Sequence, residues 1–193
     1  AFAGDRFIVR DWSGQATLAG GIVLDPDAAR GNRRREEDVK FLKPRAEAPG
    51  HVLSFVVSEL LRNGAVQRST LLVKSRFSEK EILDAISRLK AEQRVFSKGD
   101  LVADAAWWQA LCKRAEEAID AEHAAHPERI GLSLSELRGK LEGRLLLSEV
   151  FDVLLDDLGR KDFVRVDTAI RRATHRPALP PRLQAVGDKL RAV

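Results

Sequence analysis

SEKEILDAISRLKAEQRVFSKGDLV, residues 78–102, is the stretch of the chain that decides the fold. Ser78 is followed three residues later by Glu81, a capping box that marks the first turn of a helix over residues 79–92. Two short runs of strand-forming residues then flank a Lys-Gly-Asp turn within residues 95–102. The apolar positions of the helix recur at helical spacing and are Ile82, Ile86 and Leu89. The stretch therefore predicts a helix that runs into a β-hairpin.

Two more helices precede this one. Apolar pairs at helical spacing predict a helix over residues 51–63, and Asn63-Gly64 supplies residues that accept the left-handed conformation and end it. A short helix is expected near residues 69–75. Three helices followed by a β-hairpin is the order of a winged helix. We therefore predict a first winged helix over residues 51–103.

The same order then repeats. A helix is predicted over residues 105–125, a short helix begins at the capping box of Ser133 and Glu136, and a third helix covers residues 145–158, before strands within residues 162–172. A shift of 69 residues aligns six apolar positions: Leu72 with Leu141, Ile82 with Phe151, Ile86 with Leu155, Leu89 with Leu158, Val95 with Val164 and Leu101 with Ile170. We predict a second winged helix over residues 104–173. Residues 174–193 read as a hinge and the first helix of a third, truncated unit.

The chain begins with a different kind of sequence. RFIVRDWSGQATLAGGIVLDP, residues 6–26, predicts two strands that are apolar on one face, with Phe7 and Val9 in the first and residues 22–24 in the second. We expect residues 1–26 to form a hairpin that packs on the first winged helix or on another molecule, or to be mobile. Residues 27–50 contain an arginine cluster and Pro49-Gly50, which is typical of a basic linker.

The 6–26 phrase resembles the last strands of the third, EF-Tu-like domain of selenocysteine-specific translation elongation factors, the SelB family. The phrase THRPALPPRLQAV, residues 174–186, is similar to that family's junction into its third winged helix. Ala16 stands where the family usually has arginine, and Ala19 interrupts the usual glycine run. The resemblance covers nearly the whole chain. It implies a mainly α fold with small β (α+β), in which tandem winged-helix domains follow a β-hairpin remnant of a β-barrel domain.

Members of this family bind GTP, deliver selenocysteyl-tRNA to the ribosome and recognise a hairpin in selenoprotein mRNA. The resemblance implies that GTP and Mg²⁺ belong to N-terminal domains outside this chain. What it leaves here is a spacer or RNA-binding module that links the tRNA-binding body to the mRNA-binding tip during selenocysteine incorporation at UGA codons. We expect a cytoplasmic monomer whose partners, in the full-length protein, are the tRNA, the mRNA hairpin and the ribosome.

No chemistry of catalysis can be argued from the residues. A glycine-rich phosphate loop ending in Lys-Ser/Thr is absent from the sequence, and adjacent acids such as Glu116-Glu117 suit a solvated helix face. His123 and His126 have helical spacing without a third ligand nearby, so we expect a solvated helix end and no metal site. The single cysteine, Cys112, fits a reducing compartment and reads as a buried apolar residue. We predict that the chain is not an enzyme, has no cofactor and does not span a membrane.

The charge distribution permits a nucleic-acid partner. Residues 104–158 carry six net negative charges, whereas residues 159–193 carry six net positive charges. The candidate RNA-binding residues are Arg33, Arg34, Arg35, Arg165, Arg171, Arg172, Arg176 and Arg182. The alternative is that these arginines keep a linker soluble or pair with the preceding acidic unit. The 145–158 helix has four acids and no base, so it favours a spacer or docking surface over a helix that reads a groove.

Two other functions remain open. Tandem winged helices are common in DNA-binding transcriptional regulators, although these would require a basic third helix and a dimer element. Winged helices also serve as protein-interaction scaffolds, and absence of salt-dependent RNA affinity would favour that function.

Overall fold

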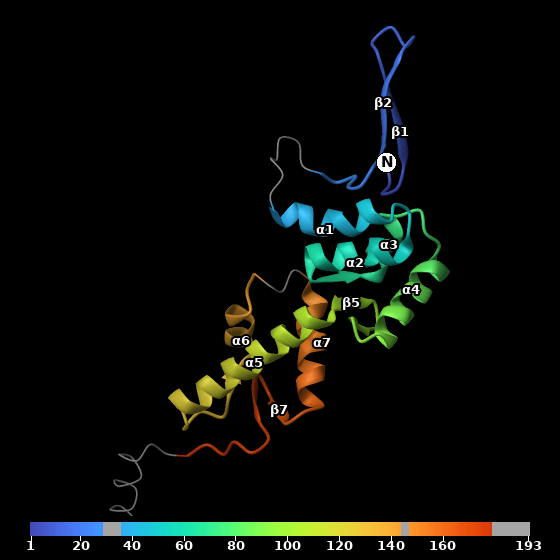
Figure 1. The fold of residues 1–193 in the computed structure, drawn as a ribbon. Helices are drawn as coiled ribbons and strands as arrows, with labels where there is room; N and C mark the ends of the chain where they lie inside the picture. Colours follow the sequence, from blue (N-terminus) through green and yellow to red (C-terminus); the bar gives the residue numbers. More distant parts are fainter. Residues whose placement is uncertain (29–35, 144–146, 179–193) are drawn as a thin grey trace, which may run out of the picture. The chain divides into compact units, whose positions relative to one another are not determined.

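The computed structural model describes residues 1–28, 36–143 and 147–178 (Figure 1). The chain divides into two compact units, Ala1–Trp108 and Gln109–Val193. The division lies inside the helix α5 (Ala105–Ala125), whereas the prediction placed the domain boundary between residues 103 and 104. Small antiparallel sheets and helices of moderate length make up both units, so the fold is α+β.

The first unit contains a helical core closed by a three-stranded sheet. Its elements after residue 51 are α2 (Val52–Asn63), β3 (Ala65–Gln67), α3 (Arg68–Val73), α4 (Glu79–Ala91), β4 (Val95–Lys98) and β5 (Leu101–Asp104). The last strand is the central one, because the sheet order is β3-β5-β4. The apolar stripe of α4 is buried, with Ile82 and Leu89 fully inaccessible to solvent. All three predicted helices and the predicted hairpin are confirmed.

Local signals fix where these helices begin and end. Ser78 accepts a hydrogen bond from the Glu81 N–H while the Glu81 carboxylate accepts one from the Ser78 N–H, so the predicted capping box is present. Gly64 ends α2 with φ +73°, and its N–H donates to the Leu60 carbonyl at 2.7 Å. A Cβ at Gly64 would lie 2.4 Å from Nε1 of Trp107, so the position needs glycine both for its conformation and for the close approach of the indole.

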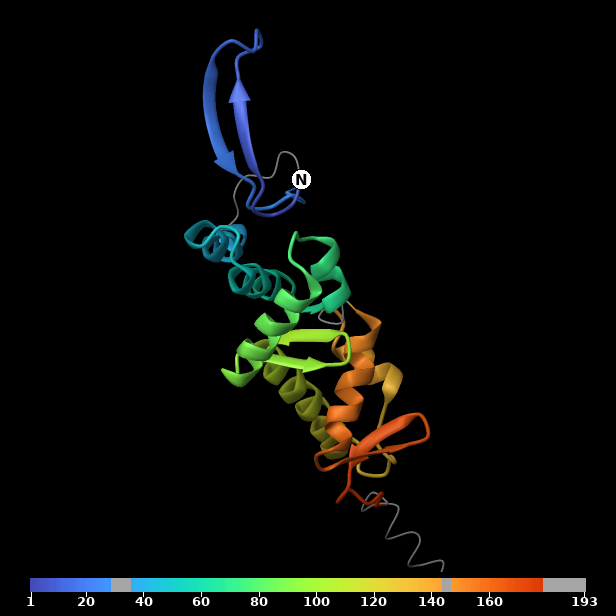
Figure 2. The same cartoon turned by 90° about the vertical axis from the view of Figure 1, so that its right-hand side faces the viewer.

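The second unit repeats the order of elements. It consists of α5, β6 (Leu132–Ser133), α6 (Leu134–Lys140), α7 (Ser148–Gly159), β7 (Phe163–Val166) and β8 (Ala169–Arg172), and its sheet order is β6-β8-β7. Figure 2 shows β7 and β8 in orange-red as a two-stranded hairpin beside α7. The capping box of Ser133 and Glu136 is confirmed. The predicted start of the third helix, residues 145 and 146, lies outside the described residues.

The 69-residue repeat holds for helices α4 and α7 and slips in the hairpin that follows. Glu79 and Ser148, the first residues of these helices, are 69 residues apart, whereas Val95 and Phe163, which begin the next strands, are 68 apart. The predicted match of Val95 with Val164 is therefore wrong: Val164 is 42% exposed, and Phe163 takes the buried place. A connection shorter by one residue changes the face to which a strand residue points.

Three elements escaped the sequence prediction. Strands β3 and β6 are only three and two residues long, too short to show an alternating pattern. The helix α1 (Glu36–Glu47) occupies half of the predicted linker 27–50, and it contains Pro44. Figure 1 shows α1 alongside α2, where Phe41 and Arg45 of α1 are buried. Packing against α2 thus overrides the weak helical signal of this segment.

Residues 1–26 form the predicted hairpin, with two corrections. Strands β1 (Arg6–Arg10) and β2 (Thr17–Ile22) pair antiparallel, with Phe7 opposite Gly21. The second strand begins at Thr17 and includes Gly20 and Gly21, earlier than the predicted residues 22–24. The glycines make room for Phe7, since a Cβ at Gly21 would lie 2.6 Å from the Phe7 ring. The strands are exposed along most of their length, and they carry apolar side chains on both faces, whereas the prediction had one apolar face. Large exposed apolar side chains of this segment are Phe2, Phe7, Ile8, Val9, Trp12 and Leu18.

Candidate functional site

The predicted RNA-binding arginines fall into two groups. Arg165 lies in β7, Arg171 and Arg172 lie in β8, and Arg176 follows that strand, so the structure brings four of them together at one end of the second unit. The other candidates, Arg33, Arg34, Arg35 and Arg182, lie outside the described residues. The candidate interface within the described residues is therefore the β7–β8 hairpin with the segment after it.

Acids of α5 neutralise two cations of this region. Arg172 donates to both oxygens of Asp120, from Nε at 2.5 Å and Nη2 at 2.6 Å. These hydrogen bonds lower the pKa of Asp120 and raise that of Arg172. Lys161 donates to Glu116 at 2.9 Å, which raises the pKa of the lysine. Arg172 thus pairs with an acid of the preceding acidic segment, which is the alternative to RNA contact given above.

Two more arginines bind backbone carbonyls. Nη1 of Arg171 donates to the His175 carbonyl at 2.6 Å, and Nη1 of Arg176 donates to the Ala173 carbonyl at 3.1 Å. These bonds shape the chain after β8, and neither guanidinium is hydrogen-bonded to a carboxylate of the residues that the structure describes. Arg165 is exposed, as Arg176 is, and its Nε likewise donates to a backbone carbonyl, that of Asp167, at 3.2 Å.

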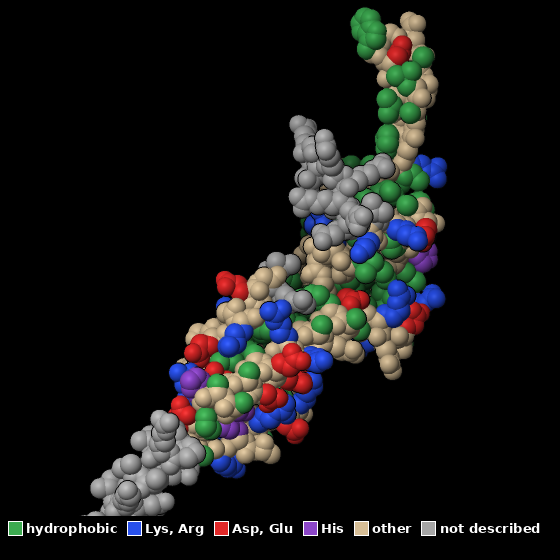
Figure 3. Space-filling view, turned by 60° about the vertical axis from the view of Figure 1, so that its left-hand side comes forward, with side chains coloured by type: hydrophobic (Ala, Val, Ile, Leu, Met, Phe, Trp, Pro, Cys, Tyr) green, Lys and Arg blue, Asp and Glu red, His purple; other side chains and the backbone are tan. Residues whose placement is uncertain are grey.

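An open groove lies beside Arg165. The groove has a volume of about 480 Å³. Its lining includes the basic residues Arg160 and Arg165 and the acidic residue Asp156. Its apolar walls include Phe163 and Ile170. Glu149, Asp152 and Asp157 are further acidic residues of the helix α7, outside the groove lining. On the face shown in Figure 3, basic and acidic side chains of the second unit are intermixed. Such mixed charge attracts a polyanion less than a continuous basic patch would.

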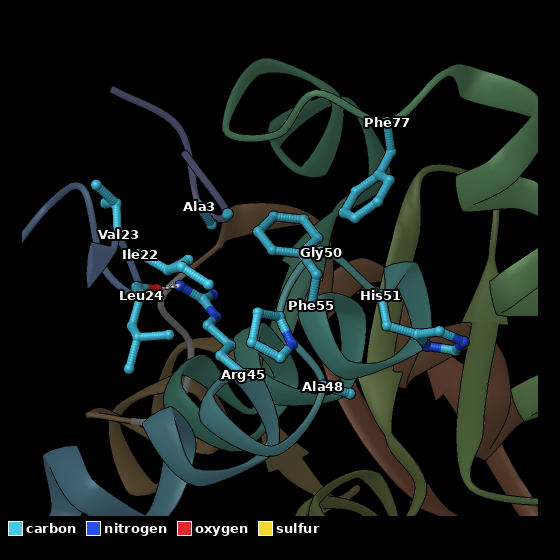
Figure 4. Close-up of a pocket in the computed structure, with 12 residues that line it drawn as sticks. Ala3, Ile22, Val23, Leu24, Arg45, Ala48, Gly50, His51, Phe55 and Phe77 are labelled. Atoms are coloured by element: carbon cyan, nitrogen blue, oxygen red, sulfur yellow. Dashed lines mark hydrogen bonds between the residues drawn. The ribbon is translucent and has the colours of Figure 1, made fainter. Parts of the chain in front are cut away.

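A second constellation, at the root of the β1–β2 hairpin, was not found from the sequence. Arg45 of α1 is 5% exposed, and its side chain donates to Ser58 at 2.6 Å, to the Leu24 carbonyl at 2.7 Å and to the carboxylate of Glu59. Its guanidinium also lies 5.1 Å from the ring centroid of Phe55. Figure 4 shows the Arg45 side chain reaching Leu24 beside a cavity of about 20 Å³, which is room for about one water molecule.

Ion pairs surround this root. Asp5 pairs with Arg76 at 2.9 Å, and Asp25 with Arg62 at 3.2 Å. Asp27 pairs with Lys74 at 3.0 Å, and that hydrogen bond lowers the pKa of Asp27. The carboxylates all belong to residues that flank the hairpin strands, and the cations all belong to the helical part of the first unit. Their spacing in the sequence, 37 residues or more between partners, gives no local signal that could have revealed them.

Two histidines form a further contact that sequence reasoning missed. His123, expected at a solvated helix end, stacks on His175 with ring centroids 3.8 Å apart and planes 6° from parallel. Burial lowers the pKa of His123. Cys112, by contrast, is buried as predicted, and burial followed by the charge of Asp157 raises its pKa to about 12.

Within residues 1–28, 36–143 and 147–178, no group of three or more His, Cys, Asp or Glu side chains is arranged to hold a metal ion. In the same part of the chain, no helix combines the length and the apolar character that crossing a bilayer needs. Comparisons with protein-family models and with curated proteins find no significant match to this chain.

Proposed function

We propose that this chain is a connecting module of a translation elongation factor similar to the selenocysteine-specific factors. In this proposal it consists of two winged helices that carry, at their N-terminal side, a β-hairpin belonging to a preceding β-barrel domain. It has no catalytic site of its own. Its task is to hold the tRNA-binding body and the mRNA-binding tip of the factor in a fixed relationship.

The repeated topology supports the two winged helices. Each unit runs helix, strand, helix, helix, strand, strand, and in each the last strand lies between the other two. This is the order and sheet arrangement of a winged helix. Two copies in succession agree with the tandem organisation that the resemblance implies.

The observation that carries the connecting role is the anchored root of the hairpin. Buried Arg45 and three ion pairs tie residues on both sides of the strands to the helices of the first unit. The strands themselves expose apolar side chains on both faces, and no other strand of the described residues pairs with their outer backbone edges. If these strands belong to a neighbouring sheet, their fixed root couples the orientation of that sheet to the helices of the first unit.

RNA contact is secondary in this proposal. Arg172 is bound to Asp120 and Lys161 to Glu116, so both serve the packing of the unit. The acidic side chains of α7 disfavour insertion of that helix into a groove of nucleic acid. We assign contact with the phosphate backbone of tRNA, the mRNA hairpin or ribosomal RNA to Arg165, which is exposed on β7.

A fluorescence-anisotropy titration tests this function against the DNA-binding alternative. The ligands are a selenoprotein mRNA hairpin, a tRNA and an unrelated DNA duplex, each at two salt concentrations. We expect weak, salt-sensitive RNA binding that Arg165→Ala reduces and Arg172→Ala, as long as the variant stays folded, leaves unchanged. Preferential binding of the DNA duplex contradicts the proposal and supports a transcriptional regulator. Absence of binding to every ligand removes the role of Arg165 and leaves the connecting role alone.

A further inference from the structure

The stacked histidines join three segments of the second unit. His123 lies in the last two turns of α5, and His175 lies in the segment after β8. Nε2 of His175 is 2.9 Å from the carbonyl oxygen of Arg129, which belongs to the connection between α5 and β6. The parallel rings therefore stand where the chain, having completed the β7–β8 hairpin, returns to the end of α5.

Backbone hydrogen bonds hold this returning segment in place. The N–H of Ala173 donates to the Asp162 carbonyl at 2.7 Å, and the N–H of His175 donates to the Arg172 carbonyl at 3.1 Å. The N–H of Ala178 donates to the Pro127 carbonyl at 3.0 Å. We call residues 173–178 the docked segment. Its hydrogen bond farthest from β8 is that of Ala178. This bond is made to Pro127, just after the end of α5 that carries His123.

The surroundings of His123 disfavour its charged form. Its Nε2 is buried and has no hydrogen-bond partner among the residues that the structure describes. Burial and the adjacent His175 ring lower the pKa of His123 below its ordinary value of 6.5, and the guanidinium of Arg172 adds to this effect. Asp120 and Glu122, both on α5, act in the opposite direction.

These two carboxylates are engaged with other cations. Asp120 is bonded to Arg172, and Glu122 to the Arg129 side chain at 2.8 Å. The guanidinium of Arg129 also lies 3.7 Å from Glu136 of α6. The two acids near the stack are thus already paired with arginines, and they offer little net attraction to an added proton on His123.

We propose that His123 and His175 form a pH-sensitive latch, which holds the docked segment against α5 while His123 is neutral and releases it when His123 takes a proton. The direction of the pH effect follows from the linkage between proton binding and docking. A base whose pKa is lowered in the docked state binds its proton more readily after release, so docking weakens as the pH falls below 6.5. The latch does not depend on the proposed function.

Amide exchange measured by NMR on this chain tests the latch between pH 7.5 and pH 5. The reporter is the Ala178 N–H, and the internal reference is the Leu134 N–H, which donates to the Thr168 carbonyl at 2.8 Å within the sheet region. Protection factors are corrected for the intrinsic effect of pH. We expect protection at Ala178 to fall by up to about tenfold per pH unit, the slope for uptake of one proton, while Leu134 keeps its protection.

Two variants make the assignment specific. His123→Phe keeps an aromatic ring in the stack and removes the titrating group, so Ala178 should stay protected at pH 5. His126→Phe is the matched control, because His126 directly follows the end of α5 and is not a member of the stack, and it should keep the pH dependence of the unaltered chain. Protection at Ala178 that does not change with pH overturns the latch. A pH-dependent loss that persists in His123→Phe, or that Leu134 shares, overturns it as well.

Discussion

The guanidinium of Arg172 and the carboxylate of Asp120 form a two-point pair that fastens β8 to α5. Arg172 also lies over the Phe163 ring, 4.7 Å from its centroid. A guanidinium that is bonded through two of its three nitrogens and lies on one face of an aromatic ring has little freedom to reach a phosphate. The charge excess of residues 159–193 therefore serves, in part, the packing of the unit that precedes it.

Removal of Arg172 should cost the second unit little stability. Asp120 is 45% exposed, so solvent screens the pair, and we expect Arg172→Ala to lower the free energy of unfolding by about 0.5–1 kcal/mol at pH 7. The pKa of Asp120 is lowered in the fold, so the pair stabilises above the ordinary value of 3.8 and loses its effect as the pH falls through the folded value.

Urea unfolding of both proteins at pH 7 and pH 2.5 measures this difference. Lys113→Ala is the control, because its pair with Glu117 is exposed on both sides and should contribute almost nothing at either pH. The free energies of unfolding of Arg172→Ala and of the unaltered chain should differ less at pH 2.5 than at pH 7. An equally large difference at both pH values would show that the Asp120 carboxylate is not the partner that matters.

Arg45 should be far more costly to remove. Arg45→Ala leaves Glu59, which is 3% exposed, buried without its counter-charge, and we expect a loss of about 3–5 kcal/mol in the free energy of unfolding of the first unit. Urea unfolding measures it. The double variant Arg45→Met with Glu59→Leu removes both charges and should be more stable than Arg45→Ala. A double variant less stable than the single one would contradict the buried pair as the cause.

Gly64 and Gly99 give a matched comparison of strain and space. Both have positive φ, +73° and +61°, but only Gly64 has the Trp107 indole against the position of a Cβ. We expect Gly99→Ala to cost about 1 kcal/mol through backbone strain alone and Gly64→Ala to cost roughly 1–3 kcal/mol more through the steric clash. Thermal unfolding of the two variants measures both effects. Equal losses would mean that the indole moves aside freely.

Cys112 should resist alkylation in the folded chain. Its thiol is buried and its pKa is raised to about 12, so almost no thiolate exists at pH 8. We expect iodoacetamide to modify Cys112 at pH 8 only after urea unfolds the second unit. Mass spectrometry follows the modification, and rapid labelling without urea would show that the helix α5 opens in the native state.

The sequence predicted most of the helices because their signals are local. Two capping boxes and the glycine after Asn63 mark helix ends within a few residues, and all three are present. The missed elements lack such signals. The helix α1 is held by Phe41 and Arg45 against α2, and a contact between residues 13 or 14 positions apart leaves no trace in local periodicity.

The surroundings of the candidate site could not be predicted, for the same reason. Composition shows that the segment is basic, but it could not tell that Asp120, 52 residues before Arg172, lies beside it. The stack of His123 on His175 spans a similar distance. Charge counts describe how many groups are present, and only the fold decides which of them neutralise one another.

The most direct test of the connecting role is a chimeric selenocysteine-specific elongation factor in which this chain replaces the equivalent segment. Recoding of UGA in a selenoprotein reporter is the measurement. We predict that the chimera recodes, and that Arg76→Ala combined with Arg62→Ala and Lys74→Ala, which removes the three ion pairs at the hairpin root, lowers recoding without weakening the binding of GTP or selenocysteyl-tRNA. A chimera that binds GTP, the tRNA and the mRNA hairpin normally but fails to recode would contradict the account.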